Sequence, residues 1–420
     1  MRKSYEAVVI GGGIVGCCTA AELARAGVQV LLLERSELAS AASGRNHGLI
    51  FYPQNDVTGD LYRLSHEMYR ELATSSELDI GLDDRPRGLL IVVKDETEWP
   101  AAEAEAQASQ AGGIDVTRLD EFELRAEEPN VAHGHLGGYL IDDSYRLDPA
   151  SLALAFALEA RGAGAEVRTH TDVKQILTRN GRVRGVATDD GTVEAEIVVV
   201  AAGPWAAKLA RTVEVDLPIT GARGWLLLTR AFEDEVARHL VESAGWHLLG
   251  GDPGPGEVTV GDYARGDLPR ASDVGLLVQQ NRSGHVLLGG SRLFSMREDP
   301  EGVEVTSEIA RRAVETLPVL AEARIAAVWS GVRPMSRDGV PLIGPLDAIE
   351  GLIVAGGHGG QGVMLAGGTG RLVAQMLTGT DPALDPRPFR PDRFRRDGGG
   401  RRQVTGNLRA RRDSNPRPRD

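Results

Sequence analysis

The sequence predicts an α/β protein in which a doubly wound, mainly parallel sheet is interleaved with a mainly antiparallel β domain that carries helices. Three features of the 420-residue chain indicate this fold. The chain opens with a strand, a glycine turn, a helix and a second strand within residues 5–34. From about residue 217 to 330 it alternates short apolar runs with turns. Residues 352–377 again predict a strand, a glycine loop and a helix.

The first 34 residues contain a complete βαβ unit. The apolar run at residues 5–10 predicts a strand, and the Ala-rich residues 14–26 predict a helix that Gly27 ends. The continuous apolar run at 28–33 is typical of a parallel strand buried on both faces. The turn before the helix is Gly11-Gly12-Gly13-Ile14-Val15-Gly16, which fits the pattern G-x-G-x-x-G.

Each glycine of this turn has a physical role. Gly11 permits the tight turn, Gly13 lets the backbone approach a pyrophosphate, and Gly16 lets the helix pack closely on the strand. The pyrophosphate would lie at the helix N-terminus, which stabilises negative charge. Glu34 ends the second strand, where a carboxylate accepts hydrogen bonds from ribose hydroxyls and disfavours NADP. We therefore predict a dinucleotide site, for which the motif alone leaves FAD and NAD open.

The chain between these ends predicts further elements in order. Helices are expected at residues 61–72, 97–111, 148–161 and 306–317, and strands at 88–93, 167–170, 173–178, 182–188, 194–200 and 286–290. Residues 112–143 are expected to be irregular.

Composition limits the classes of function. With 42% hydrophobic and 25% charged residues, the chain has the make-up of an ordinary globular protein, and its length suits two domains. The net charge of −13 disfavours nucleic acid as the main partner. Cys17 and Cys18 are adjacent, so neither a disulfide staple nor a metal site is expected, and a cytoplasmic location is favoured. The sequence contains no stretch of about 18 apolar residues, so no transmembrane segment is predicted.

Three further segments carry distinctive motifs. They are Ala42-Ser43-Gly44-Arg45-Asn46-His47-Gly48, then Ala201-Ala202-Gly203-Pro204-Trp205, and last Gly331-Val332-Arg333-Pro334 with the runs 338–344 and 355–362. With the N-terminal unit they span residues 5–378 and resemble, in order, the FAD-dependent D-amino-acid oxidase superfamily, which includes glycine oxidase, sarcosine oxidase and D-amino-acid dehydrogenase. The resemblance implies a flavoprotein oxidoreductase with a Rossmann-like FAD-binding domain.

The same order of segments suggests domain boundaries. The FAD-binding domain is expected at residues 1–85, 147–215 and 325–390, and the substrate domain at 86–146 and 216–324. Residues 391–420 are expected to be a disordered basic tail, because they are rich in Arg, Gly and Pro and poor in apolar residues. Such a tail could contact anionic lipid at a membrane surface.

The resemblance also implies which residues contact FAD. They are Gly11, Gly13, Ile14, Val15, Gly16, Glu34, Arg35, Ser43, Gly44, Arg45, Asn46, Val173, Ala202, Gly203, Trp205, Gly357, Gly359, Gly360, Gln361, Gly362 and Val363. FAD is expected to be non-covalent, because the Arg333 segment lacks the cysteine that links the flavin in sarcosine oxidase. A link through histidine stays open, since His47 lies near the position of a flavin-linked histidine in dimethylglycine dehydrogenases.

Arg333 matches the arginine that holds the substrate carboxylate in this superfamily, and His358 matches a residue beside the flavin. The resemblance thus implies that these two are the catalytic residues. The substrate would be a small amino acid or N-alkyl amino acid, oxidised by hydride transfer from Cα to flavin N5 to an imine that hydrolyses to a 2-oxo acid. Tyr52 and Tyr263 are expected to bind substrate, and Trp225 and Trp246 are further candidates for the pocket wall.

Three alternatives remain open: a 2-hydroxy-acid dehydrogenase with His47 or His358 as base, a flavoprotein subunit of a larger dehydrogenase, and a non-catalytic FAD-binding protein. The electron acceptor could be oxygen or a quinone or other carrier. Lysine is scarce and absent from the C-terminal motifs, which favours a dehydrogenase over an oxidase. The sequence gives no oligomeric state.

Overall fold

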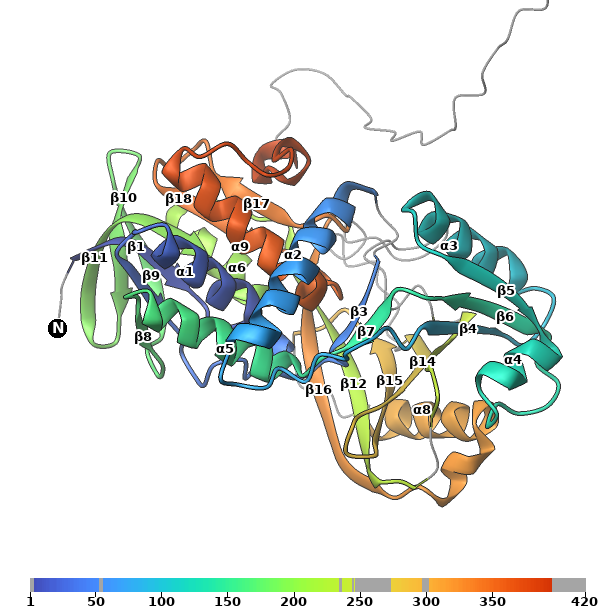
Figure 1. Ribbon diagram of the computed structural model, residues 1–420. Coiled ribbons are helices and arrows are strands. Elements are labelled where there is room, and N and C mark those ends of the chain that lie inside the picture. The colour runs from blue at the N-terminus through green and yellow to red at the C-terminus, as the bar shows by residue number, and fades with distance from the viewer. Residues whose placement is uncertain are drawn as a thin grey trace, which may run out of the picture.

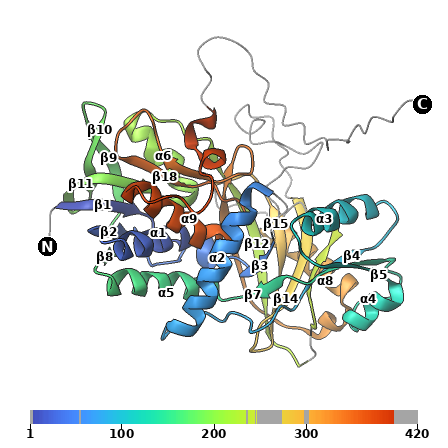
Figure 2. The same cartoon turned by 45° about the horizontal axis from the view of Figure 1, so that its top comes forward.

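The computed structural model describes residues 4–52, 56–233, 236–243, 245, 273–296 and 302–394. Two large sheets lie side by side, the first with helices packed over it and the second extending away from it (Figures 1 and 2). The predicted α/β fold class, with a parallel and an antiparallel sheet, is confirmed. Tyr263 and Trp246 lie outside the described residues, as does the tail from residue 395 on.

The first sheet has the order β17-β18-β11-β1-β2-β8. Strands β18, β11, β1, β2 and β8 run parallel, β17 is antiparallel to β18, and β9 and β10 extend from β11 as an antiparallel meander. The strands are β1 Ser4–Ile10, β2 Val30–Leu33, β8 Glu166–Arg168, β9 Val173–Arg179, β10 Arg182–Thr188, β11 Gly191–Val200, β17 Leu342–Pro345 and β18 Leu352–Gly356.

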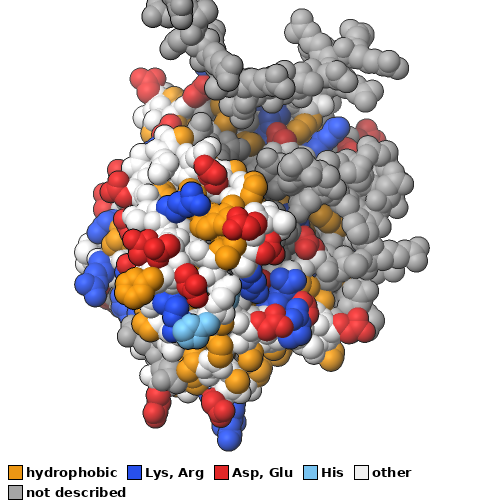
Figure 3. Space-filling view, turned by 90° about the vertical axis from the view of Figure 1, so that its right-hand side faces the viewer, with side chains coloured by type: hydrophobic (Ala, Val, Ile, Leu, Met, Phe, Trp, Pro, Cys, Tyr) orange, Lys and Arg blue, Asp and Glu red, His pale blue; other side chains and the backbone are white. Residues whose placement is uncertain are grey.

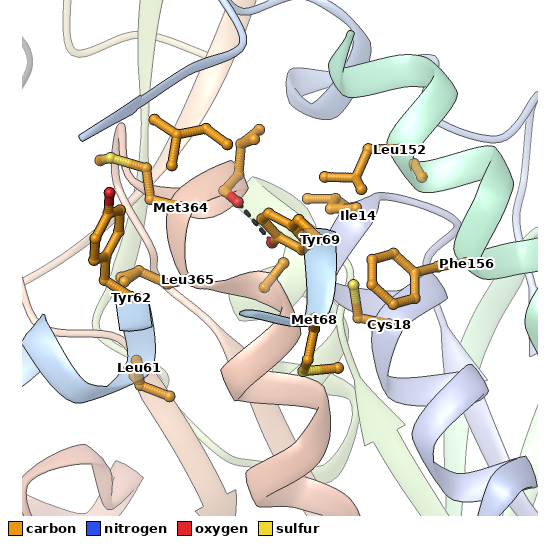
Figure 4. Close-up of a cluster of buried hydrophobic side chains, with 14 of the residues drawn as sticks. Ile14, Cys18, Leu61, Tyr62, Met68, Tyr69, Leu152, Phe156, Met364 and Leu365 are labelled. Carbon is orange, nitrogen blue, oxygen red and sulfur yellow. Dashed lines mark hydrogen bonds between the residues drawn. The ribbon is translucent and has the colours of Figure 1, made fainter. Parts of the chain in front are cut away.

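Helices α1 (Ile14–Arg25), α5 (Pro149–Gly162) and α9 (Gly362–Thr378) cover one face of this sheet, and α2 (Asp56–Ser75) packs on α9. Side chains of all four helices meet in one core, where the Tyr69 hydroxyl donates a hydrogen bond to the Val363 carbonyl at 2.7 Å (Figure 4). On β1, Ala7 and Val9 face this core. Their neighbours Val8 and Ile10 face a second core under α6 (Ala206–Ala210), so β1 is buried on both faces.

The second sheet has the order β16-β12-β15-β14-β13-β4-β6-β5 and is antiparallel except for the pair β13 and β4. Helix α8 (Gly302–Thr316) covers one face, because Val305 and Ile309 pack on that side. The other face turns toward the first sheet, with Leu277 in the core shared with α1, α2 and α9. The strands are β4 Leu89–Val93, β5 Val116–Asp120, β6 Gly137–Ile141, β12 Ile219–Ala231, β13 His239–Glu242, β14 Asp273–Gln280, β15 His285–Arg292 and β16 Ile325–Ser336.

The remaining elements are small. They are the strand pair β3 Leu49–Phe51 and β7 Ser144–Arg146, the helices α3 Trp99–Ala111 and α4 Glu121–Glu127, and 3-10 turns that include η1 Ala42–Gly44, η2 Gly203–Trp205 and η7 Pro391–Phe394. On the side that carries α3, α4 and α8, acidic, basic and apolar side chains are mixed over the described surface (Figure 3). No described helix is long and apolar enough to cross a membrane.

Three predictions of local structure need correction. Residues 112–143 are not irregular, since they form β5, α4 and β6; Asp120 and Glu123 make a capping box at the start of α4. Strand β16 was assigned to the FAD-binding segments, but it pairs with β12 along its length and belongs to the second sheet. The ordered chain also continues past residue 390 through η7, where Arg393 forms an ion pair with Asp338 at 2.8 Å.

Candidate active site

The turn between β1 and α1 places bare backbone at the carboxyl end of the first sheet. A Cβ on Gly16 would lie 1.9 Å from the Gly11 carbonyl oxygen, and a Cβ on Gly11 would lie 2.5 Å from the Ala201 oxygen. Gly11 also has a φ of +113°, which favours glycine. These contacts explain why strand, turn and helix pack so closely here.

The N-terminus of α1 faces a large cavity and has the chemistry of an anion site. No acidic residue occupies its first turn, and the backbone N–H of Ile14 donates to the Ser43 hydroxyl oxygen at 2.9 Å. Gly13 supplies the N-cap without a side chain. The turn therefore fits a pyrophosphate, which would be held by backbone N–H groups and by Ser43.

At the ribose end, the Glu34 carboxylate is oriented by two backbone donors. Its Oε2 accepts from the Gly12 N–H at 2.7 Å and its Oε1 from the Ser36 N–H at 2.8 Å. Beside it the Arg35 guanidinium lies 3.8 Å from the centre of the Trp205 ring, a cation–π contact. Arg35, Trp205 and Val173 all line the cavity, so this end offers a flat and partly apolar surface to an adenine.

Most of the predicted cofactor residues line this one cavity: Gly11, Gly13, Ile14, Val15, Glu34, Arg35, Ser43, Asn46, Val173, Ala202, Gly203, Trp205, Gly359, Gly360, Gly362 and Val363, together with Arg333 and His358. Five others do not line it: Gly16, Gly44, Arg45, Gly357 and Gln361. Gly16 and Gly44 instead allow close backbone packing, and Arg45 lines a neighbouring cavity. Lys174, Lys208 and Thr212 line the cavity but carry no sequence motif.

His358 lies where the loop before α9 meets the cavity. Its Nε2 is 2.9 Å from the Thr369 Oγ1, and that hydroxyl donates to the Leu365 carbonyl oxygen, so Nε2 carries the proton and donates to Thr369. Burial lowers the pKa of His358 to about 4. The imidazole is therefore neutral at physiological pH and is held against α9.

A second, smaller cavity adjoins the first and shares Ala42, Asn46, Arg333, Gly360 and Val363 with it. Apolar side chains from β3, β12, β14, β16 and α9 make most of its wall: Leu49, Phe51, Leu226, Leu277, Val332 and Met364. Arg333 projects from β16 at the junction of the two cavities.

The Arg333 guanidinium has few partners. One N–H donates to the Ser291 carbonyl oxygen at 2.9 Å, and no carboxylate within the described part of the chain forms an ion pair with it. Burial and the nearby Arg292 lower its pKa to about 10, so it remains a cation at neutral pH. A half-buried cation without a carboxylate partner is a strong anchor for an anionic ligand.

Glycines on two strands make room for this arginine. A Cβ on Gly224 would lie 2.3 Å from the Arg333 Nη1, and one on Gly290 would lie 3.6 Å from Nη2. A Cβ on Gly289 would lie 2.8 Å from the His47 Nε2. These glycines were not predicted as site residues, although two consecutive glycines within an apolar strand are a known sign of close approach.

Two predicted wall residues lie elsewhere. Tyr52 lines neither cavity; it is buried against Tyr62, with ring centres 5.7 Å apart, and the Arg63 guanidinium lies over its ring. Trp225 packs its ring over Gly302 at the start of α8. Both aromatic rings are used for packing, and the apolar part of the second cavity's wall is instead made of aliphatic side chains and one phenylalanine.

The first cavity extends from the N-terminus of α1 to that of α9, which suits an elongated dinucleotide. The Arg333 guanidinium at its junction with the second cavity suits a substrate that carries a carboxylate. The fold and the site thus define a dinucleotide-dependent oxidoreductase. Residues 6–376 match the family described as FAD dependent oxidoreductase, and the chain belongs to this family.

Individual relatives agree with this assignment. Glycine oxidase of Pseudomonas aeruginosa is 29% identical over 398 residues, covering 92% of this chain and 99% of the relative. Glycine oxidase of Bacillus licheniformis is 29% identical over 90% of this chain and 94% of its own. The crystal structure of glycine oxidase from Geobacillus kaustophilus superposes with a TM-score of 0.79 at 26% identity, covering 93% of this chain and 99% of that one.

Proposed function

We propose that this flavoprotein oxidises a small α-amino acid or N-alkyl amino acid to an imine, which hydrolyses to a 2-oxo acid. The observation that carries the proposal is Arg333, a cation without a carboxylate partner in the described chain, at the junction of the cofactor cavity and a small apolar cavity. The similarity to proteins named glycine oxidase supports an amino acid over a 2-hydroxy acid.

FAD would be held without a covalent bond. The N-terminus of α1 and Ser43 would bind the pyrophosphate, Glu34 the ribose, and Arg35 and Trp205 would flank the adenine. The loop 357–362 would lie against the isoalloxazine, with the N-terminus of α9 close to it. Bound FAD supplies the acceptor for a hydride.

The chain's own residues bind and orient the substrate. Arg333 would bind the carboxylate through two parallel N–H donors, which fixes the substrate's Cα relative to the cofactor cavity. The apolar wall excludes water and accepts a small side chain or N-alkyl group. We propose His358 as a residue that contacts the cofactor through its ring or backbone, since its Nε2 is committed to Thr369.

Anaerobic mixing of the holoenzyme with a panel of substrates tests the reaction. D-amino acids, glycine and N-methyl amino acids should bleach the flavin absorbance, and matched 2-hydroxy acids should not. Bleaching by hydroxy acids alone would overturn the proposal.

Replacement of Arg333 tests the anchor. Arg333→Met should raise KM for the best amino acid by about 100-fold, because a charged hydrogen-bonded pair is lost, and Arg333→Lys by about tenfold, because a point charge replaces the planar fork. Both variants should retain the wild-type flavin content. An unchanged KM in both variants would contradict the role of Arg333.

The electron acceptor and the location are further parts of the proposal. Oxygen or a quinone-type carrier can reoxidise the flavin, and the absence of lysine among the described residues that line the second cavity favours the carrier. Comparing substrate-dependent oxygen uptake with the reduction of a quinone analogue decides between them. A cytoplasmic location fits the two cysteines, both of which are free and buried.

A further inference from the structure

The second cavity has four polar side chains in its wall: Arg45, Asn46, His47 and Arg333. Two of them are already engaged. The Asn46 amide donates to the Ala42 and Ser43 carbonyl oxygens and accepts from the Gly48 N–H, and Arg45 donates to two carbonyl oxygens. The guanidinium groups of Arg45 and Arg333 keep unused N–H donors, and the His47 ring keeps an unused acceptor nitrogen.

His47 is unusual because its imidazole makes no hydrogen bond to any described residue. Both ring nitrogens are shielded from water and lack a partner, while the His47 backbone oxygen accepts from the Gln279 side-chain amide at 2.7 Å. An unpaired polar group in such a place costs about 1–3 kcal/mol, which a ligand with a matching group can recover. His47 lines the second cavity, and a Cβ on Gly289 would lie 2.8 Å from its Nε2, so this glycine leaves the space beside the nitrogen free of a side chain.

The charges around His47 determine which group it can bind. Arg333 on β16, His239 on β13 and Arg146 on β7 face it, and no carboxylate is among the described residues that line the cavity. Burial and these neighbours lower the pKa of His47 to about 3, and burial with Arg87 and Arg146 lowers that of His239 to about 3. His47 is therefore a neutral acceptor in a cationic environment, which repels an ammonium group but accepts an uncharged N–H.

We propose that His47 is a specificity-determining residue that accepts a hydrogen bond from the substrate's uncharged amine while Arg333 binds the carboxylate. This inference rests on the proposed amino-acid oxidation and deepens it. The pair offers a donor and an acceptor beside a wall that is made mostly of apolar side chains. It selects anionic aminocarboxylates over simple carboxylates and over zwitterions.

Two variants and two ligands separate this role from packing. His47→Leu removes the acceptor at similar volume, and His47→Gln retains a neutral acceptor. The ligands are the amino acid that bleaches the flavin fastest and the carboxylate of the same carbon skeleton without the amine, which is held by Arg333 alone. Dissociation constants come from anaerobic flavin reduction for the first ligand and from perturbation of the flavin spectrum for the second.

We expect His47→Leu to weaken binding of the amino acid about tenfold and binding of the plain carboxylate less than about twofold. His47→Gln should recover amino-acid binding to within about threefold of the wild type. Equal losses for both ligands, or no loss for either, would show that His47 only packs and would overturn the inference.

The pH dependence of binding supplies a second readout. Since neither His47 nor His239 titrates between pH 5 and 9, wild-type affinity for the amino acid should rise about tenfold per pH unit up to the pKa of the free amine. Affinity that does not change with pH would mean that the zwitterion binds, and would overturn the inference. The proposed function itself is tested separately with the wild-type protein: it fails if no amino acid bleaches the flavin.

Discussion

The two cavities meet at Arg333 but are built in different ways. The cofactor cavity is made largely of backbone: its glycines, its helix N-termini and the N–H groups that orient Glu34 come from turns whose residues are consecutive in the sequence. The second cavity is made of side chains from β3, β12, β14, β16 and α9, which only the fold brings together. A cofactor shared by a family can be held by local backbone geometry, whereas the choice of substrate depends on side chains distant in the sequence.

Because the cofactor cavity depends on close backbone packing, we expect one added methyl group there to lower FAD affinity more than any other change described below. Gly16→Ala places a methyl group 1.9 Å from the Gly11 oxygen, so β1 and α1 must separate and the turn that would hold the pyrophosphate is lost. We expect FAD affinity to fall roughly a thousandfold, about 4 kcal/mol. The ratio of flavin to protein absorbance after gel filtration measures this.

A matched control lies in α5. A Cβ on Gly162 would meet no atom within 4 Å, so Gly162→Ala should leave flavin content unchanged and stabilise the helix by up to about 1 kcal/mol. If Gly16→Ala retained flavin as well as Gly162→Ala does, the backbone description of the cofactor site would be wrong.

Buried histidines near both cavities should make the free energy of unfolding depend on pH. His47 at the second cavity and its neighbour His239 have pKa values near 3, and His358 at the first cavity has one near 4, all lowered mainly by burial from 6.5. The unfolded chain binds protons below pH 6.5 that the folded protein excludes, so the free energy of unfolding falls as the pH drops from 7 to 5. Each histidine should account for about 2 kcal/mol of that loss.

Single replacements isolate these contributions. His239→Gln and His358→Gln should each reduce the difference in unfolding free energy between pH 7 and pH 5 by about 2 kcal/mol in urea titrations. Comparing each variant with the wild type cancels other groups, such as Glu105, whose pKa burial raises to about 9. A pH dependence equal to that of the wild type would show that the histidine is not buried neutral.

On the substrate side, a glycine-to-alanine change should act on binding and leave the cofactor in place. A Cβ on Gly224 would lie 2.3 Å from the Arg333 Nη1 and 2.7 Å from the Ser291 oxygen that accepts its hydrogen bond. We expect Gly224→Ala to displace the guanidinium and to raise KM about tenfold, with unchanged flavin content. Steady-state kinetics beside flavin absorbance test this, and loss of flavin would mean that the two cavities are not separable.

The same difference explains what the sequence could predict. The β1–α1 turn, Glu34 and the strand and helix that follow residue 351 were predicted because glycine spacing and apolar runs are local signals. Tyr52 was expected at the substrate and lies in the core, since an aromatic residue after a strand gives no sign of its direction. The edge strand β5, with mostly exposed side chains, lacked the apolar alternation that predicts a strand. The roles of Gly224 and His47 could not be predicted, because they depend on the positions of β12 and β15 beside Arg333 in the folded chain.

The adenine end should show the smallest effect, because it depends on one exposed contact instead of on backbone packing. Arg35→Ala removes the guanidinium 3.8 Å from the centre of the Trp205 ring, a contact worth about 0.5–1 kcal/mol at an accessible site. We expect FAD to bind two- to fivefold more weakly, measured by titrating apoprotein with FAD, with KM for the amino acid unchanged. Arg35→Lys retains a cation but loses the planar stack and should fall between the wild type and Arg35→Ala. A loss as large as that of Gly16→Ala would show that side chains, and not the glycine turn, dominate cofactor binding.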